Sequence, residues 1–150
     1  MKIYREITPL DPREVYSIFN HPNANFDYPL HNHPEYELNL VMNAAGNRIV
    51  GDKIEKYDGC DLVLLGPYLN HNWDGSDTDR QKKNSPHAVV LQFSENLFQG
   101  NFLSKSAFIP IKTMLDYSVR GIEYHGETRE LVKRQLLRLV DLEGFAGALA

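Results

Sequence analysis

The chain is poor in cysteine, in positive charge and in long apolar runs. Cys60 is the only cysteine among 150 residues, so no internal disulfide can form and nothing indicates an oxidising compartment. Lysine and arginine number 16 against 20 acidic residues, and the net charge of −4 argues against a nucleic-acid surface, which needs a basic footprint. No segment could span a bilayer, and the charged N-terminus is unlike a signal peptide. We therefore expect a cytoplasmic protein with no membrane partner.

The remaining composition is that of an ordinary globular domain. Hydrophobic residues make up 42% and charged residues 24% of the chain, and 150 residues suffice for one substantial core. The pattern changes from strands to helices along the sequence. We expect a single domain over residues 1–150, with a barrel over about residues 1–93 and a helical extension over about residues 94–150.

The first part is predicted to contain many short strands separated by tight turns. Runs rich in Val, Ile, Leu, Tyr and Phe predict strands over residues 14–19, 35–42, 48–50, 53–57, 61–65 and 87–93. Turn residues predict breaks at residues 43–47, 51–52, 58–59 and 66–67. A polar loop is expected over residues 74–86. Such a pattern is typical of a sandwich, a jelly roll or a barrel.

The last part is predicted to be helical. Ser94 is placed to cap a short helix over residues 95–99, and Pro110 and Gly121 bracket a second helix with a helical repeat of apolar residues. A third helix is expected over residues 127–142. Residues 143–150 resemble the start of another helix, so the chain looks like an excised domain rather than a naturally short protein.

Two histidines and a glutamate are spaced for one face of an extended chain. Side chains alternate along a strand, so His31, His33 and Glu37 point the same way, and Asn39 shares their parity. His71 is a fourth candidate. Three imidazoles and one carboxylate form a suitable site for zinc, nickel, manganese or iron. Without a metal, the same groups form a polar pocket that hydrogen-bonds an organic ligand.

Three further residues bear on this pocket. Trp73 shares the face of His71, where it either forms an aromatic wall for a sugar ring or packs the barrel edge. Gln92 is a weaker lining candidate, because the sequence does not orient its strand. Arg48 is expected to be a solvent-exposed strand residue.

These residues carry a resemblance to cupins. The His-x-His-x-x-x-Glu pattern of residues 31–37 resembles the first cupin motif, and Gly59, Pro67 and His71 resemble the second. The resemblance implies a mainly β cupin fold, a double-stranded β-helix or jelly-roll barrel followed by two to three packing helices. It also implies that His31, His33, Glu37 and His71 are the ligands in members that hold a metal.

A narrower resemblance covers nearly the whole chain. The sequence is similar to the N-terminal domain of AraC-type transcription regulators in residues 31–38, 50–52, 61–67, 71–73, 91–95 and 126–129. In that family the cupin domain binds a small effector, often a sugar, and the following helices support a homodimer. DNA would be bound only through a C-terminal domain, which is absent from this chain.

Three functions follow from these observations. The leading hypothesis is a ligand-sensing and dimerising domain that needs no cofactor, with an optional divalent metal and with ligand contacts from His31, His33, Glu37, Asn39, His71 and Trp73. The alternative is a small metal-dependent cupin enzyme, a dioxygenase or a sugar isomerase; against it, no further acid or base stands out near the motifs. The third is an interaction module with a vestigial pocket.

Overall fold

The longest element of the fold is a hairpin of two strands. Strands β4 (Tyr36–Val50) and β5 (Lys53–Leu65) pair antiparallel along their whole length around a turn at Gly51, where φ is 63°. The structure is a computed structural model, and it describes residues 1–78 and 84–150. The predicted turn at residues 51–52 is confirmed.

A bulge at Asn43 bends this hairpin. Asn43 has no partner across the strand pair, and its φ of 56° lies in the left-handed region, as does the φ of 78° at the neighbouring Gly59. An extra residue in one strand bends and twists the pair without ending it. The turns predicted at residues 43–47 and 58–59 are therefore wrong, because the turn-forming residues there bend two continuous strands.

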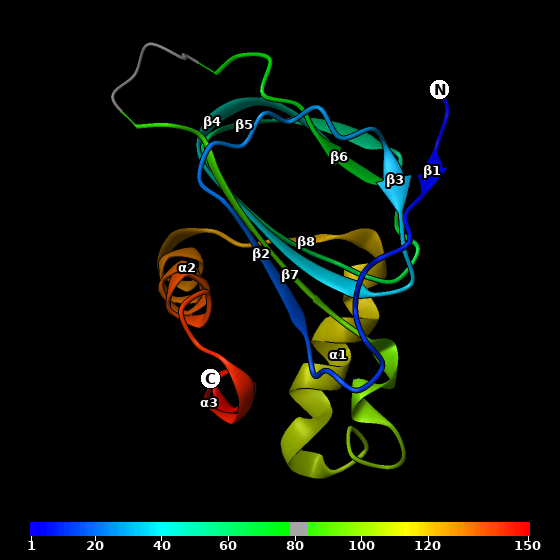
Figure 1. Cartoon of the computed structure of the whole chain (residues 1–150). Coiled ribbons are helices and arrows are strands. Elements are labelled where there is room, and N and C mark those ends of the chain that lie inside the picture. Colours follow the sequence, from blue (N-terminus) through cyan, green and yellow to red (C-terminus); the bar gives the residue numbers. More distant parts are fainter. Residues whose placement is uncertain (79–83) are drawn as a thin grey trace.

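The bend distributes one eight-stranded sheet over two layers (Figure 1). The first half of β4 pairs with β7 (His87–Phe93), which pairs with β2 (Ser17–His21). The second half of β4 pairs with β6 (His71–Trp73), which is followed by β3 (His31–Asn32) and then β1 (Tyr4–Arg5). Strand β8 (Ile122–Glu123) pairs with the end of β5. The two layers enclose the interior of a β-barrel.

The helices follow β7 and lie outside the lower layer in Figure 1. They are α1 (Ile109–Tyr117), α2 (Gly126–Leu139) and α3 (Gly144–Leu149), with short 3-10 turns at Glu95–Phe98, Ser106–Phe108 and Ser118–Arg120. The Ser94 hydroxyl caps the first turn by accepting a hydrogen bond from the Asn96 amide at 3.1 Å. The predicted helices are confirmed, although the third ends at Leu139 rather than at residue 142.

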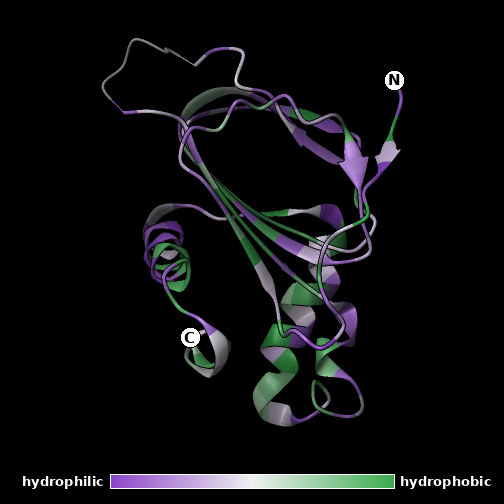
Figure 2. Ribbon diagram, viewed as in Figure 1, coloured by the Kyte–Doolittle hydropathy of each residue, from purple (hydrophilic) through white to green (hydrophobic). Residues whose placement is uncertain are grey.

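Alternation along the strands separates two apolar clusters. Val41, Val63 and Leu65 point into the barrel, whereas Leu40 and Leu62 face outward and pack with Leu136 of α2. Both clusters exclude water almost completely. Figure 2 shows hydrophobic and hydrophilic residues side by side along α2, as expected for a helix with one buried face.

This architecture confirms the mainly β fold predicted from the sequence, a barrel followed by helices. Within the described part of the chain, no helix combines the length and the hydrophobicity needed to cross a bilayer. The loop expected over residues 74–86 is confirmed at residues 74–78 and 84–86, and its residues 79–83 lie outside the described part of the chain.

Candidate functional site

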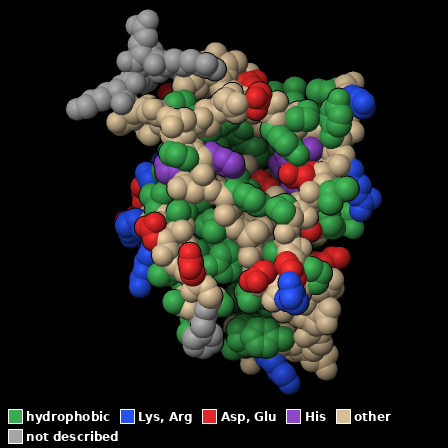
Figure 3. Space-filling view, viewed as in Figure 1, with side chains coloured by type: hydrophobic (Ala, Val, Ile, Leu, Met, Phe, Trp, Pro, Cys, Tyr) green, Lys and Arg blue, Asp and Glu red, His purple; other side chains and the backbone are tan. Residues whose placement is uncertain are grey.

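A cavity of about 560 Å³ lies between the two layers of the sheet. One end is polar, with His31, Glu37 and His71 in its lining, and aromatic side chains that include Phe26 and Trp73 form its wall. Figure 3 shows histidine and acidic side chains together in a recess of this face of the molecule. The cavity thus combines polar groups with an apolar surface, as small-molecule sites do.

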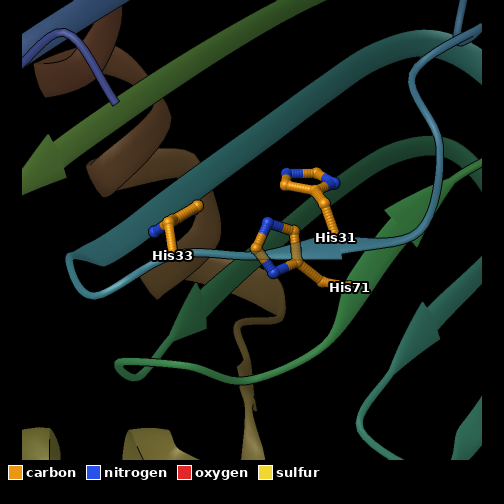
Figure 4. A group of neighbouring side chains, drawn as sticks. All are labelled: His31, His33 and His71. Carbon is orange, nitrogen blue, oxygen red and sulfur yellow. The ribbon is translucent and has the colours of Figure 1, made fainter. Parts of the chain in front are cut away.

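Three histidines converge at the polar end (Figure 4). His31 and His71 are opposite each other in the β3–β6 ladder, and their ring centroids are 4.2 Å apart. His33 comes directly after β3, with its ring centroid 5.0 Å from that of His71, and only 1% of it is exposed. One nitrogen from each ring lies within 4.8 Å of the others.

Backbone carbonyls orient two of these rings. The Nδ1 atom of His31 is 2.8 Å from the carbonyl oxygen of Pro29, and Nδ1 of His71 is 2.8 Å from that of Leu69. Each Nδ1 therefore carries the proton and donates it to the carbonyl, which leaves a lone pair on Nε2. Metal-binding histidines are commonly oriented in this way.

Glu37 is a buried carboxylate held by several donors. Its Oε2 accepts hydrogen bonds from His33 Nε2 at 2.9 Å and from Gln92 Nε2 at 3.0 Å, and its Oε1 accepts one from Asn39 Nδ2 at 3.0 Å. Burial raises the pKa of this carboxyl. The interactions with His71 and His33 and the hydrogen bond from Gln92 lower it by more, so that the pKa is about 2. Glu37 is therefore an anion at neutral pH.

The pKa values of the two buried histidines beside Glu37 are shifted in opposite directions. Burial lowers the pKa of His71 to about 4, so this ring is neutral at pH 7. Burial also acts to lower the pKa of His33, but its hydrogen bond to Glu37 and the charges of Glu37, Glu6 and Glu35 outweigh burial and raise it. His33 thus holds a second proton more tightly than a free imidazole does, and His71 offers a free lone pair.

Two residues that the sequence did not identify as strong candidates complete the polar end. Glu6 follows β1, and its Oε2 lies 3.5 Å from His31 Nε2 and 4.0 Å from His33 Nε2. Glu6 was missed because no motif links it to His31; only the parallel pairing of β1 with β3 brings them together. Gln92 was left as a weak candidate, and the register of β7 against β4 places it directly opposite Glu37.

Trp73 packs in the barrel, as one of its two expected roles requires, and its contact with a sugar ring stays a prediction. It lines the cavity, and it packs in the interior cluster with 6% of its surface exposed. The expectation for Arg48 is wrong: only 3% of this residue is exposed, and its guanidinium forms ion pairs with Asp61, Glu55 and Glu123. The bent hairpin and β8 surround Arg48 with carboxylates, which compensate the burial of its charge.

The structure brings all six predicted site residues together. Those that line the cavity are His31, Glu37, Asn39, His71 and Trp73, and His33 lies behind them in contact with Glu37. Their convergence does not depend on a continuous strand. Residues 33–35 lie between β3 and β4, yet His33 and Glu37 still meet.

The polar end fits a divalent metal. His71 Nε2 is buried and has no hydrogen-bond partner among the described residues. Ligand atoms in a tetrahedral zinc site with bonds of about 2.0–2.1 Å are about 3.3 Å apart, and His71 Nε2 lies 3.6 Å from Glu37 Oε1. His31, His33, His71 and a carboxylate would hold such a metal, which would act as a Lewis acid when bound.

Comparison with known proteins adds little to this description. No family model and no curated protein matches the chain. Among solved structures, the chain is similar to a cupin 2 conserved barrel domain protein from Rhodopseudomonas palustris, with 16% sequence identity and a TM-score of 0.38. The match covers 57% of this chain and 56% of that protein, so it spans little more than half of either. So slight a likeness carries no ligand, activity or partner to this chain.

Proposed function

We propose that this chain is the effector-binding and dimerisation domain of an AraC-type transcription regulator, and that its effector is a small, sugar-like molecule bound in the barrel. The observation that carries the proposal is the cavity of about 560 Å³, with one polar end and an aromatic wall. This volume lies within the range of about 300–1,000 Å³ that is typical of small-molecule sites.

The polar groups of the cavity favour a ligand rich in hydrogen-bond donors. Asn39 and Gln92 both direct their amide nitrogens at Glu37, and their carbonyl oxygens are buried with no donor in the described part of the chain. Leaving such acceptors unpaired is costly, so a ligand hydroxyl that reaches them gains affinity. Of the described residues that line the cavity, none is lysine or arginine. These features suit a neutral polyol better than a carboxylate or a phosphate.

An apolar surface on the helices supports the dimer. The exposed fractions of Ile109, Tyr117 and Val119, in and just after α1, are 52%, 63% and 53%. Exposed apolar side chains that gather on one element favour association with another protein surface. In this proposal a second copy covers them, and effector binding shifts the arrangement of the helices that precede a DNA-binding domain.

The proposal is tested by measuring the melting temperature with matched ligands. Neutral aldoses and polyols are compared with the corresponding sugar acids and sugar phosphates. We expect a neutral compound to raise the melting temperature with the logarithm of its concentration. In Asn39→Leu the apparent affinity falls about tenfold or more, whereas the exposed control Asn101→Leu binds as the wild type does. Stabilisation by anions alone would contradict the proposal, as would the absence of any stabilising compound.

A metal-dependent enzyme is the second candidate, and it is favoured by His71 Nε2, which has no hydrogen-bond partner among the residues that the structure describes. In this alternative, a metal at the polar end would polarise a sugar or a catechol substrate. Stoichiometric metal in the purified protein together with turnover of such a compound would support the enzyme. Tight binding of a sugar by metal-free protein, without turnover, would instead support the sensor.

A further inference from the structure

The N-terminal segment contributes a carboxylate to the histidine cluster. The Glu6 amide donates a hydrogen bond to the Asn32 carbonyl at 2.9 Å, which fixes the backbone of residue 6 beside β3. Glu6 Oε2 then lies 3.5 Å from His31 Nε2, and its Oε1 accepts a hydrogen bond from the Tyr28 hydroxyl at 3.1 Å. The side chain of Glu6 is 22% exposed, so it closes the outer side of the cluster.

Glu6 and His31 face each other as two acceptors. The Nδ1 proton of His31 is directed at the Pro29 carbonyl, so its Nε2 presents a lone pair, and the Glu6 carboxylate presents lone pairs as well. When no proton is on Nε2, two such groups repel unless a cation lies between them. Their separation of 3.5 Å is close to the distance of about 3.3 Å between neighbouring ligands of a tetrahedral zinc ion.

Glu37 is less available to a metal than Glu6. Asn39 donates to its Oε1 and Gln92 to its Oε2, and these amides keep their protons when a metal binds, whereas His33 Nε2 must give up its proton to become a ligand. Glu6 Oε2, in contrast, receives no hydrogen bond from the described residues and lies 4.0 Å from His33 Nε2. Of the two carboxylates, Glu6 has the free oxygen that faces the histidines.

We propose that Glu6 is a metal ligand, and that His31, His33, His71 and Glu6 together hold one divalent cation such as Zn²⁺. Glu37 remains bound to Asn39 and Gln92. This inference goes beyond the proposed effector site and does not depend on the identity of the effector. It makes the N-terminal segment part of the metal centre, although no part of the histidine motif lies near residue 6 in the sequence.

The proposal has a structural consequence for the N-terminus. Strand β1 has only two residues, and nearby side chains are exposed, by 47% at Ile3 and 94% at Ile7. Short, exposed terminal segments open easily. A metal bonded both to Glu6 and to the histidines of the barrel would hold this segment against β3. Metal binding should therefore protect the N-terminus from proteases.

Trypsin and Zn²⁺ provide the test, because Arg5 directly precedes Glu6. The wild type is digested with and without Zn²⁺, and its Zn²⁺ affinity is measured by competition with a coloured chelator. We expect Zn²⁺ to slow cleavage after Arg5 about tenfold or more. In Glu6→Gln, which keeps the size of the side chain and an acceptor for Tyr28, we expect a 10- to 100-fold loss of affinity and no protection. Glu14→Gln, at an exposed site, serves as the matched control and should behave as the wild type.

Several results would overturn the proposal. Wild-type affinity and protection in Glu6→Gln would show that Glu6 is not a ligand. Protection that persists in His31→Ala would show that Zn²⁺ acts elsewhere. Failure of the wild type to bind Zn²⁺ would also refute it, yet it would leave the effector proposal intact, since sugars are tested on metal-free protein. Circular dichroism of each variant shows whether the fold is retained.

Discussion

Trp73 donates its indole N–H to Asp61 Oδ2 over 2.7 Å, and the other oxygen of the same carboxylate binds Arg48. A residue of the cavity wall is thus tied to a buried ion pair. Burial raises the pKa of Asp61, although Trp73 and Arg48 oppose this by stabilising the anion. Because Arg48 also binds Glu123 in β8 at 2.5 Å, the network joins the cavity to the segment between α1 and α2.

Replacing Arg48, the positively charged residue of this network, should strongly destabilise the fold. In Arg48→Met the buried carboxylate of Asp61 loses its partner, and we expect the free energy of unfolding to fall by about 3–5 kcal/mol. Urea unfolding followed by the fluorescence of Trp73, the only tryptophan, measures the loss. The double variant Arg48→Met/Asp61→Leu should be more stable than the sum of the single effects predicts. Strictly additive losses would show that the two residues do not act as a pair.

The stability of the metal-free protein should depend on pH through His71. The pKa of this ring is lowered to about 4 in the folded protein, against about 6.5 in the unfolded chain. Between these values the unfolded chain binds a proton that the folded protein does not bind. The free energy of unfolding should therefore fall by up to about 3 kcal/mol as the pH drops from 6.5 to 4.

Urea titrations in the presence of a chelator, at pH values from 7 to 4, test this dependence. In His71→Gln, the part of the pH dependence of the unfolding free energy that is due to this ring should vanish. His33 acts in the opposite sense, because its pKa is raised in the folded protein. Its contribution to the free energy of unfolding is therefore lost as the pH rises. If the unfolding free energy of His71→Gln depended on pH as that of the wild type does, His71 would not be the cause of this dependence.

Two glycines of the hairpin should respond differently to alanine. A methyl group at Gly46 would overlap the backbone carbonyl of Asp74, whereas one at Gly59 would meet no atom within 4 Å. At Gly59 only the left-handed φ of 78° opposes the substitution, so we expect a loss of about 1 kcal/mol. At Gly46 the backbone must move, and a loss of about 1–3 kcal/mol or more is expected. Thermal unfolding ranks the two variants, and a greater loss at Gly59 would contradict the packing described.

The contact between α2 and the barrel should also contribute to stability. Leu136 is 3% exposed and packs against Leu40, Leu62 and Val89. Truncation in Leu136→Ala removes this contact and leaves a cavity, at a cost of about 2–5 kcal/mol in the free energy of unfolding. The control Leu131→Ala, at a position 49% exposed on the same helix, should change stability far less. Equal losses in urea unfolding would show that α2 does not pack as described.

Short-range features of this protein could be predicted from its sequence. The short spacing of His31, His33 and Glu37 predicted that they lie together, and β7 and the Gly51 turn lie where the residue pattern predicted them. The N-cap at Ser94 is confirmed, and Pro110 lies in the first turn of α1, which begins one residue earlier than predicted. These features depend on side-chain alternation and turn chemistry, which act over a few residues and are therefore visible in the sequence.

What the sequence could not determine depends on pairing between distant segments. Around the bulge at Asn43, β4 and β5 continue through two of the predicted turns as one long, bent hairpin, which buries Arg48 among carboxylates. Parallel pairing of β1 with β3 brought Glu6 to His31, and the register of β7 turned Gln92 toward Glu37. By itself, the sequence determined which polar side chains share a strand face. Only the tertiary structure decided which strands are neighbours, because register and pairing are set by contacts across the whole barrel.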